Sequence, residues 1–266
     1  MPKKRNASPV DIEGIYEDYI SNKSNENRKA RYDGKESYYH ASSTGSCSRK
    51  IWFESVQKAV PTNLPDSRAQ RLLRLGTIVH DDIQESLLQY NVTSNVTSNV
   101  TIHSNEEKEN NIKEKESEFF VEEEITIPSL NVRGFYDLVA KVSEEVYLFD
   151  FKTMAAYTWS RKFGHNKDPN PSRLHEMQLG TYGIAIKEKF GRLDGMYLCY
   201  YKKDDSRLKT VPVSMSYLGY AESYWRDINE EHKKGLPMFR EGVSPAYPWM
   251  CGYCQFKTLC NPVSFK

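Results

Sequence analysis

Apolar residues along the chain follow a helical spacing in some segments and a strand-like spacing in others. Between residues 68 and 90 they recur at steps of three and four, which predicts an amphipathic helix. Further helices are expected at 9–30, 172–189 and 216–234. From residue 119, short turns separate three apolar runs, "FFVEEEITI", "VRGFYDLVAKV" and "EVYLFDFKT", which predict three successive strands.

The order of these elements predicts one α/β domain with a central mixed β-sheet flanked by helices. Two later runs, "GMYLCYYK" and "KTVPVSM", supply further strands. We expect residues 1–40 to form an N-terminal helical extension and residues 41–266 to form the main domain. The repeat "NVTSNVTSNVT" and the charge run after it predict a flexible insert at 91–118. Residues 153–171 are expected to be a loop.

Composition narrows the functional classes. A net charge of +1 over 266 residues gives no global basic field, so any nucleic-acid binding must occur in a local groove. No apolar run approaches the roughly 20 residues of a membrane span, and the N-terminal residues lack the apolar region of a secretory signal. We therefore expect a cytoplasmic protein without a membrane partner. In that compartment five cysteines favour metal ligands or small buried hydrophobic residues over disulfides.

Two carboxylates are predicted to meet on neighbouring strands. In "EVYLFDFKT", Asp150 and Lys152 lie on one face because side chains alternate along a strand. A turn centred at residues 143–144 would place Asp137 directly opposite Asp150, with Cβ atoms about 4.5–5.5 Å apart. Such carboxylates repel each other, so one takes up a proton or a cation lies between them, and Mg²⁺ or Mn²⁺ suits oxygen ligands. The alternative is a surface hairpin whose carboxylates are in water.

Three cysteines are close together near the end of the chain. The stretch "PWMCGYCQFKTLC" contains Cys251, Cys254 and Cys260, whereas Cys47 lies far upstream. Spacing alone leaves a zinc site and an iron–sulfur site open. Cys199 lies in the middle of a predicted strand and is expected to be a small buried hydrophobic residue.

Several of these motifs together resemble one enzyme superfamily. "GFYD" followed by "DFK" resembles the pattern of the PD-(D/E)xK nucleases. "LGTIVHDDI", with His80, resembles the helix that precedes the sheet in their RecB-like branch, and "HEMQLGTYGIA" resembles that branch's Q-x-x-x-Y motif through Gln178 and Tyr182. One upstream and three downstream cysteines resemble the members that carry a 4Fe–4S cluster, such as CRISPR-adaptation-associated single-domain exonucleases and related phage nucleases. The resemblance runs from about residue 47 to residue 260.

This resemblance implies a fold, a cofactor and a reaction. The fold is a restriction-endonuclease-like core whose N- and C-terminal segments are joined by an iron–sulfur cluster on Cys47, Cys251, Cys254 and Cys260, with Zn²⁺ as the alternative. The reaction is metal-dependent hydrolysis of DNA, most readily by an exonuclease acting on single strands or duplex ends. The implied Mg²⁺ or Mn²⁺ ligands are His80, Asp137, Asp150 and the carbonyl of Phe151. Lys152 would orient the attacking water, with Gln178 and Tyr182 near the metal or the DNA strand.

Two further groups of residues are candidates for contact with DNA. Arg68, Arg71 and Arg74 lie three residues apart on one predicted helix and could contact phosphates, or could form an ordinary solvated face. Tyr157 and Trp159, in the predicted loop after the catalytic strand, could stack on unpaired bases.

Two other functions compete with the nuclease. One is a catalytically inactive DNA-binding or assembly protein that keeps the fold and the cysteines, because fold alone does not imply activity. The other is a zinc-stapled interaction module. Proteins of recombination, replication or CRISPR adaptation are possible partners if the nuclease prediction is correct.

Overall fold

The computed structural model describes residues 11–32, 38–97, 117–165, 167–168, 173–240 and 242–260. The helices are α1 (Ile12–Tyr32), α2 (Ser48–Ile51), α3 (Ser67–Thr97), α4 (Ala156–Phe163), α5 (Arg173–Phe190), α6 (Ser216–Lys233) and α7 (Trp249–Gly252). Short 3₁₀ turns cover Ala41–Ser43 and Pro128–Leu130, and a π-helical turn, Trp52–Val56, follows α2. The strands are β1 (Tyr39–His40), β2 (Ser117–Ile127), β3 (Val132–Val142), β4 (Glu145–Met154), β5 (Gly195–Lys202) and β6 (Leu208–Val213).

The strands form one mixed sheet in the order β1-β3-β4-β5-β6, with β2 paired to β3. The β2–β3, β3–β4 and β5–β6 pairs are antiparallel, whereas β1–β3 and β4–β5 are parallel. The predicted register of the β3–β4 hairpin is confirmed, because Val142 pairs with Glu145 and Leu138 with Phe149. This mixed α/β arrangement fits a restriction-endonuclease-like core.

One edge of β3 is shared by two strands. β4 pairs with β3 only from Leu138 to Val142, and β1 pairs with its other end at Val132 and Arg133. Because β2 follows the opposite edge along the whole of β3, the sheet forks between these two pairings. Gly134 lies in the fork, where a Cβ would be 2.8 Å from the side chain of Ala41. Only glycine therefore allows this close approach without a shift of its neighbours.

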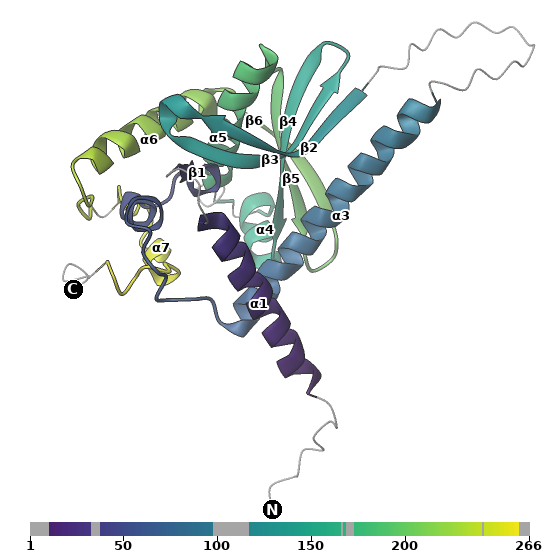
Figure 1. The fold of residues 1–266 in the computed structure, drawn as a ribbon. Coiled ribbons are helices and arrows are strands. Elements are labelled where there is room, and N and C mark those ends of the chain that lie inside the picture. Colours follow the sequence, from purple (N-terminus) through teal and green to yellow (C-terminus); the bar gives the residue numbers. More distant parts are fainter. Residues whose placement is uncertain are drawn as a thin grey trace, which may run out of the picture.

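Helices cover the two faces of the sheet unequally. Figure 1 shows α5 and α6 on one side of the sheet and α3, accompanied by α1, on the other. The α5 side holds the main core, whose fully buried members include Leu148, Leu179, Ile186, Leu198 and Trp225. The helix α3 covers the other face of the sheet only in part. Several apolar residues of α3, among them Leu73 at 63% exposed, therefore remain in contact with solvent.

The segments that carry the cysteines pack together although they are far apart in the sequence. The ring of Phe53, just after α2, lies 5.9 Å from the ring of Phe256, which is fully buried. The backbone amides of Thr62 and Asn63 both donate hydrogen bonds to the carbonyl of Gln255. Apolar packing and backbone hydrogen bonds therefore join the two segments.

Several boundaries differ from those expected. The helix predicted at 68–90 runs from Ser67 to Thr97, so the first residues of the predicted insert at 91–118 are helical. Its last two residues belong to β2, which begins at Ser117. Its centre, 98–116, lies outside the described residues, as do residues 1–10 and 33–37 of the predicted extension. Tyr39 and His40 belong to the sheet rather than to an extension.

Two local predictions were wrong. Part of the loop predicted at 153–171 is the helix α4, in which Trp159 and Phe163 lie four residues apart and pack ring to ring at 4.7 Å. The segment Ala156–Phe163 is amphipathic, so the four-residue spacing of its aromatic residues was a signal that the loop prediction overlooked. Cys199 is half-buried rather than buried, because it lies on the sheet face that α3 covers only in part.

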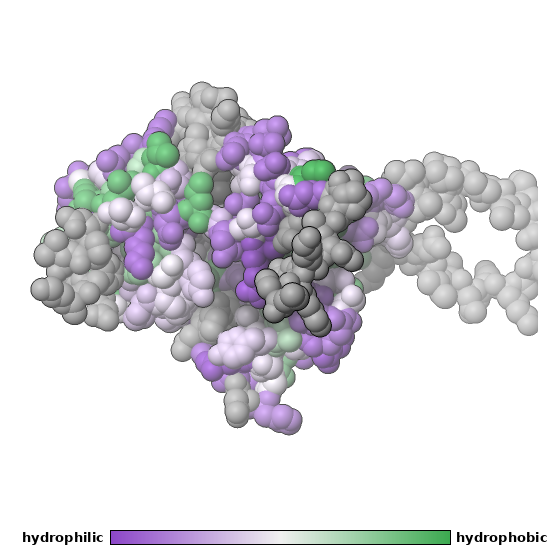
Figure 2. Space-filling model, turned by 90° about the horizontal axis from the view of Figure 1, so that it is seen from below, coloured by the Kyte–Doolittle hydropathy of each residue, from purple (hydrophilic) through white to green (hydrophobic). Residues whose placement is uncertain are grey.

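The surface is polar over most of the face seen in Figure 2, where hydrophobic residues form small, separate patches. Such scattered apolar residues are usual on a folded domain and do not mark an interface by themselves. In the described part of the chain, none of the helices has the length and apolar character needed to cross a membrane.

The contact between α5 and α6 gives a test of this packing. A Cβ on Gly180 would lie 2.3 Å from the backbone oxygen of Tyr217, whereas a Cβ on Gly219 would have no atom within 4 Å. We expect Gly180→Ala to lower the free energy of unfolding by about 2 kcal/mol, as overpacking does. Gly219→Ala should leave it unchanged or raise it by up to about 1 kcal/mol. Urea denaturation followed by circular dichroism measures both, and equal stabilities would contradict the packing.

Candidate active site

The fork in the sheet places Asp137 and Asp150 in the interior of the protein. Beyond the last pair of the β3–β4 ladder, the carboxylate of Asp137 reaches across the fork, and its Oδ2 accepts a hydrogen bond from the backbone amide of Phe151 at 2.5 Å. Asp150 is 1% exposed and Asp137 is 9% exposed. The alternative of a surface hairpin with solvated carboxylates is therefore wrong.

Burial of two acids so close together changes their protonation. The pKa of Asp137 is raised to about 8, first by burial and then by the negative charge of Asp150, although the positive charge of Lys152 partly opposes the change. Taking both carboxylates out of water as anions is costly without compensating positive charge. The pair therefore either holds a proton or binds a cation.

Lys152 and Gln178 surround the carboxylate of Asp150. The ammonium of Lys152 lies 2.5 Å from Oδ2 of Asp150, but this fully buried oxygen has no hydrogen bond of acceptable geometry in the described structure. The contact is therefore better described as an ion pair than as a hydrogen bond. The side-chain nitrogen Nε2 of Gln178, on α5, lies 3.5 Å from Oδ1 of Asp150, which is long for a hydrogen bond. The same nitrogen donates a hydrogen bond to the hydroxyl of Tyr182 at 3.0 Å.

Two histidines lie beside these groups in different ways. Nδ1 of His80, on α3, is 3.8 Å from Oδ2 of Asp137, and burial, followed by the charge of Lys152, lowers its pKa. This shift favours the neutral imidazole, the form of histidine that binds metal ions. His175, one turn before Gln178, instead contacts the hydroxyl of Tyr200 at 3.3 Å, and burial lowers its pKa to about 3.

The three arginines of α3 are not equivalent. Arg71 forms an ion pair with Glu17 of α1, and Arg74 lies 4.0 Å from Asp81 of its own helix. Arg68 is exposed. Two of the three candidate phosphate contacts are therefore already paired within the chain, which weakens the case for this row of arginines as a DNA contact.

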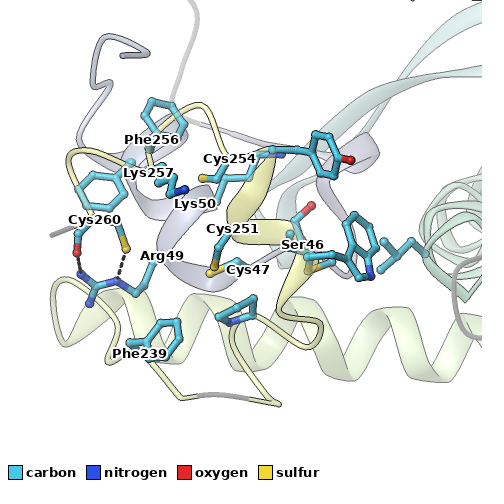
Figure 3. A pocket seen from close by; sticks show the side chains of 16 residues that line it. Ser46, Cys47, Arg49, Lys50, Phe239, Cys251, Cys254, Phe256, Lys257 and Cys260 are labelled. Atoms are coloured by element: carbon cyan, nitrogen blue, oxygen red, sulfur yellow. Dashed lines mark hydrogen bonds between the residues drawn. The ribbon is translucent and has the colours of Figure 1, made fainter. Parts of the chain in front are cut away.

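The four candidate cluster cysteines line one cavity. Cys47, Cys251, Cys254 and Cys260 surround a space of about 190 Å³ between the segment around α2 and the C-terminal segment (Figure 3). Burial raises the pKa of the Cys251 thiol, and the charges of the other three cysteines add to the effect. Among the described residues, no three Cys, His, Asp or Glu side chains already form a group that could hold a metal ion.

Sequence reasoning missed the polar residues that support this cavity. The guanidinium of Arg49 donates to the sulfur of Cys260 at 3.1 Å and to its carbonyl at 3.0 Å (Figure 3). Lys50 and Lys257 also line the cavity. The only signal in the sequence was the run "CSRK", in which two basic residues follow Cys47 almost directly.

A buried hydrogen-bond network holds the residue after Cys47. Nε2 of His232 lies 3.1 Å from the carbonyl oxygen of Ser48, and the hydroxyl of Tyr39 lies 2.9 Å from Nδ1 of His232. This arrangement assigns the proton to Nε2, because a carbonyl only accepts. The hydroxyl of Ser48 donates to Glu231 at 2.5 Å. No sequence signal links Tyr39 and Ser48 to Glu231 and His232, which lie more than 180 positions further along the chain.

Comparison with known proteins gives one family match. The family model described as the PD-(D/E)XK nuclease superfamily matches residues 89–261, a region that begins after Cys47 and His80. No curated protein matches the chain. Among solved structures, the one titled "Crystal structure of SSO0001" aligns with 93% of this chain and 96% of its own, at 18% identity and a TM-score of 0.48. On the strength of the family model, this chain belongs to the PD-(D/E)XK nuclease superfamily.

Proposed function

We propose that the protein is a metal-dependent deoxyribonuclease, acting as an exonuclease on single strands or duplex ends. The observation that carries the proposal is the buried pair Asp137 and Asp150 beside Lys152. Membership of a nuclease superfamily supports hydrolysis of DNA, whereas the preference for ends and single strands comes from the resemblance to the RecB-like branch. DNA is the partner that this activity requires.

The donor atoms at the fork fit a hard divalent cation. They are carboxylate oxygens, and one of them, Oδ2 of Asp150, is buried and makes an ion pair with Lys152 but no hydrogen bond. When bound, Mg²⁺ or Mn²⁺ neutralises charge that develops on the phosphate and makes a water molecule more acidic. Asp137 and Asp150 would hold this ion together with neutral His80, and the resemblance adds the carbonyl of Phe151.

The remaining residues would orient the reactants. Lys152 lies on the same strand face as Asp150, with its side chain 17% exposed, so its ammonium can reach both a water molecule and a phosphate oxygen. There it would orient the nucleophile and stabilise the developing negative charge. Gln178 would keep Asp150 in position through its contact with the carboxylate and its hydrogen bond to Tyr182.

For the cysteine cavity we propose a 4Fe–4S cluster, with Zn²⁺ as the alternative. The donor set is four thiols, the ligands that such clusters use, and Arg49, Lys50 and Lys257 supply positive charge around them. A bound cluster would join the segment at Cys47 to the C-terminal segment and so restrict the unfolded chain across a very long loop. We propose a structural role for it, because the apolar cavity is separate from the fork in the sheet.

The proposed reaction is tested with end-labelled single- and double-stranded DNA, incubated with Mg²⁺, with Mn²⁺ or with a chelator. We expect degradation only with metal, and loss of about a thousandfold in rate for Asp150→Asn, the order that follows removal of one electrostatic contributor. Asp227→Asn, at an exposed carboxylate of α6, is the matched control and should cut like the parent. Cutting by Asp150→Asn at the parental rate would show that the site assignment is wrong, whereas a parent that cuts no DNA would favour the inactive DNA-binding alternative.

Asp137→Asn should separate activity from stability. In chelator, the folded protein raises the pKa of Asp137 to about 8 from an ordinary value of 3.8, so folding at neutral pH requires a proton that the unfolded chain does not hold. Stability should therefore fall as pH rises from about 4 to about 8, and the variant should lack this loss. At pH 8 we expect the variant to be more stable by at least about 1 kcal/mol, yet inactive. Parallel pH profiles of unfolding free energy would contradict this result.

The cluster is tested by iron content. Protein purified without oxygen should be brown and contain iron rather than zinc, and Cys251→Ser should lose both iron and thermal stability. Cys199→Ser is the control, because Cys199 contacts Thr210 on β6 and lies outside the cavity. Unchanged iron in Cys251→Ser would show that the ligand set is wrong, and zinc in the parent would favour the alternative.

A further inference from the structure

A second cavity lies beside α4, on the segment that directly follows the strand of Asp150 and Lys152. Its volume is about 520 Å³, and it is formed by α4 together with the turn between β5 and β6. Tyr157, Trp159 and Phe163 supply aromatic walls, and Lys202 and Arg207 supply positive charge. Nothing in the proposed hydrolysis uses these residues.

The aromatic and cationic groups of this cavity are stacked on one another. The rings of Trp159 and Phe163 are 4.7 Å apart, the guanidinium carbon of Arg207 lies 5.8 Å from the Trp159 ring, and the ammonium of Lys209 lies 4.6 Å from the Phe163 ring. Tyr157 is 73% exposed at the rim. An exposed aromatic ring beside stacked cations is the combination that sequence-independent single-strand binding uses.

Positive charge is in excess around the cavity. Lys202 and Arg207 share a single carboxylate, that of Asp205, at 2.5 Å and 2.7 Å. In the part of the chain that the structure describes, Lys209 has no carboxylate within ion-pair distance. Two cations that line the cavity therefore share one carboxylate, and Lys209 beside the Phe163 ring adds a third positive charge nearby. An anionic ligand such as a phosphate group would complete the charge balance.

A chain of side-chain contacts through the buried Tyr200 connects the cavity with the candidate active site. Lys152 pairs in register with Tyr200 of β5, and the ammonium of Lys162 lies 4.8 Å from the Tyr200 ring. The Tyr200 ring in turn meets the Phe163 ring edge to face at 5.5 Å. A row of basic and aromatic side chains thus leads from Lys152, through Lys162 and Phe163, to the cavity.

We infer that the α4 cavity binds an unpaired nucleobase of the DNA strand whose phosphate lies at Asp137 and Asp150, an inference that rests on the proposed function. Aromatic faces accept any base, because every base has a π-face, and the flanking cations meet the adjacent phosphates. A base within a duplex is stacked and paired and cannot enter such a cavity without being separated from its partner. The cavity would therefore select single-stranded DNA or a frayed end.

Tyr157 offers a clean test because it is exposed and contributes little to the core. Binding of a labelled single-stranded oligonucleotide is measured by fluorescence anisotropy in chelator, which prevents cutting. A set of oligonucleotides, each lacking one base at a different position, locates the base that the cavity holds. We expect Tyr157→Ala to bind the complete strand about tenfold more weakly, the loss of one stacked base, and to be insensitive to the missing base that weakens the parent.

Three variants act as controls for this experiment. Tyr157→Phe keeps the ring and should bind like the parent. Tyr220→Ala removes an exposed tyrosine of α6, 53% exposed and outside the cavity, and should also bind like the parent. Arg207→Gln should weaken binding at every position and reduce the dependence of log K on log salt by about 1, as loss of one phosphate contact does.

The possible outcomes test the base-binding inference separately from the proposed nuclease activity. If Tyr157→Ala binds every oligonucleotide like the parent, or if the parent binds no single-stranded DNA, the inference is overturned. If the parent cuts DNA while Tyr157→Ala binds normally, the result supports the nuclease activity and contradicts base binding in the cavity. If the parent binds with the expected base dependence yet cuts no DNA, the result supports base binding in the cavity and contradicts the proposed hydrolysis.

Discussion

The burial of two like charges at a fork in the sheet is the constraint on which the rest of this structure depends. Asp137 and Asp150 are held there by main-chain pairing on either side, with β4 leaving β3 after Leu138 and β1 taking over the same edge at Val132. Beyond Leu138 the side chain of Asp137 reaches across the fork to the backbone amide of Phe151, next to the buried Asp150. The fork thus brings two carboxylates together away from water, which is the electrostatic penalty that the proposed cation would relieve.

The cysteine cavity shows a different arrangement, in which packing and hydrogen bonds between distant segments surround the four thiols. Phe53 packs against the fully buried Phe256, and the network of Tyr39, His232 and Ser48 fixes the residue next to Cys47. Burial lowers the pKa of His232, which favours the neutral form of its imidazole. Because these contacts position the chain on both sides of the cavity, a cluster would add cohesion to segments that already meet.

The sequence predicted the parts of the site that depend on local periodicity. Strand alternation and the turn near Ser143 were sufficient to place Asp137 beside Asp150, and the four-residue spacing on α5 was sufficient to place Gln178 beside Tyr182. Contacts between distant segments were beyond such reasoning. The fork needs β1, a strand of two residues with no periodicity, and the bond from Arg49 to Cys260 joins positions 211 residues apart.

The helix α4 shows why such long-range information matters for function. Taken as a loop, residues 153–171 could present Tyr157 and Trp159 in any direction, and the two residues would be unrelated to the catalytic strand. As a helix, the segment packs Trp159 and Phe163 ring to ring and brings Phe163 against Tyr200, which is paired with Lys152. The helical backbone of α4 therefore fixes the direction in which its aromatic side chains point relative to Lys152. A chain with a net charge of +1 needs such local order, because it has no general positive field to guide a polyanion to the fork.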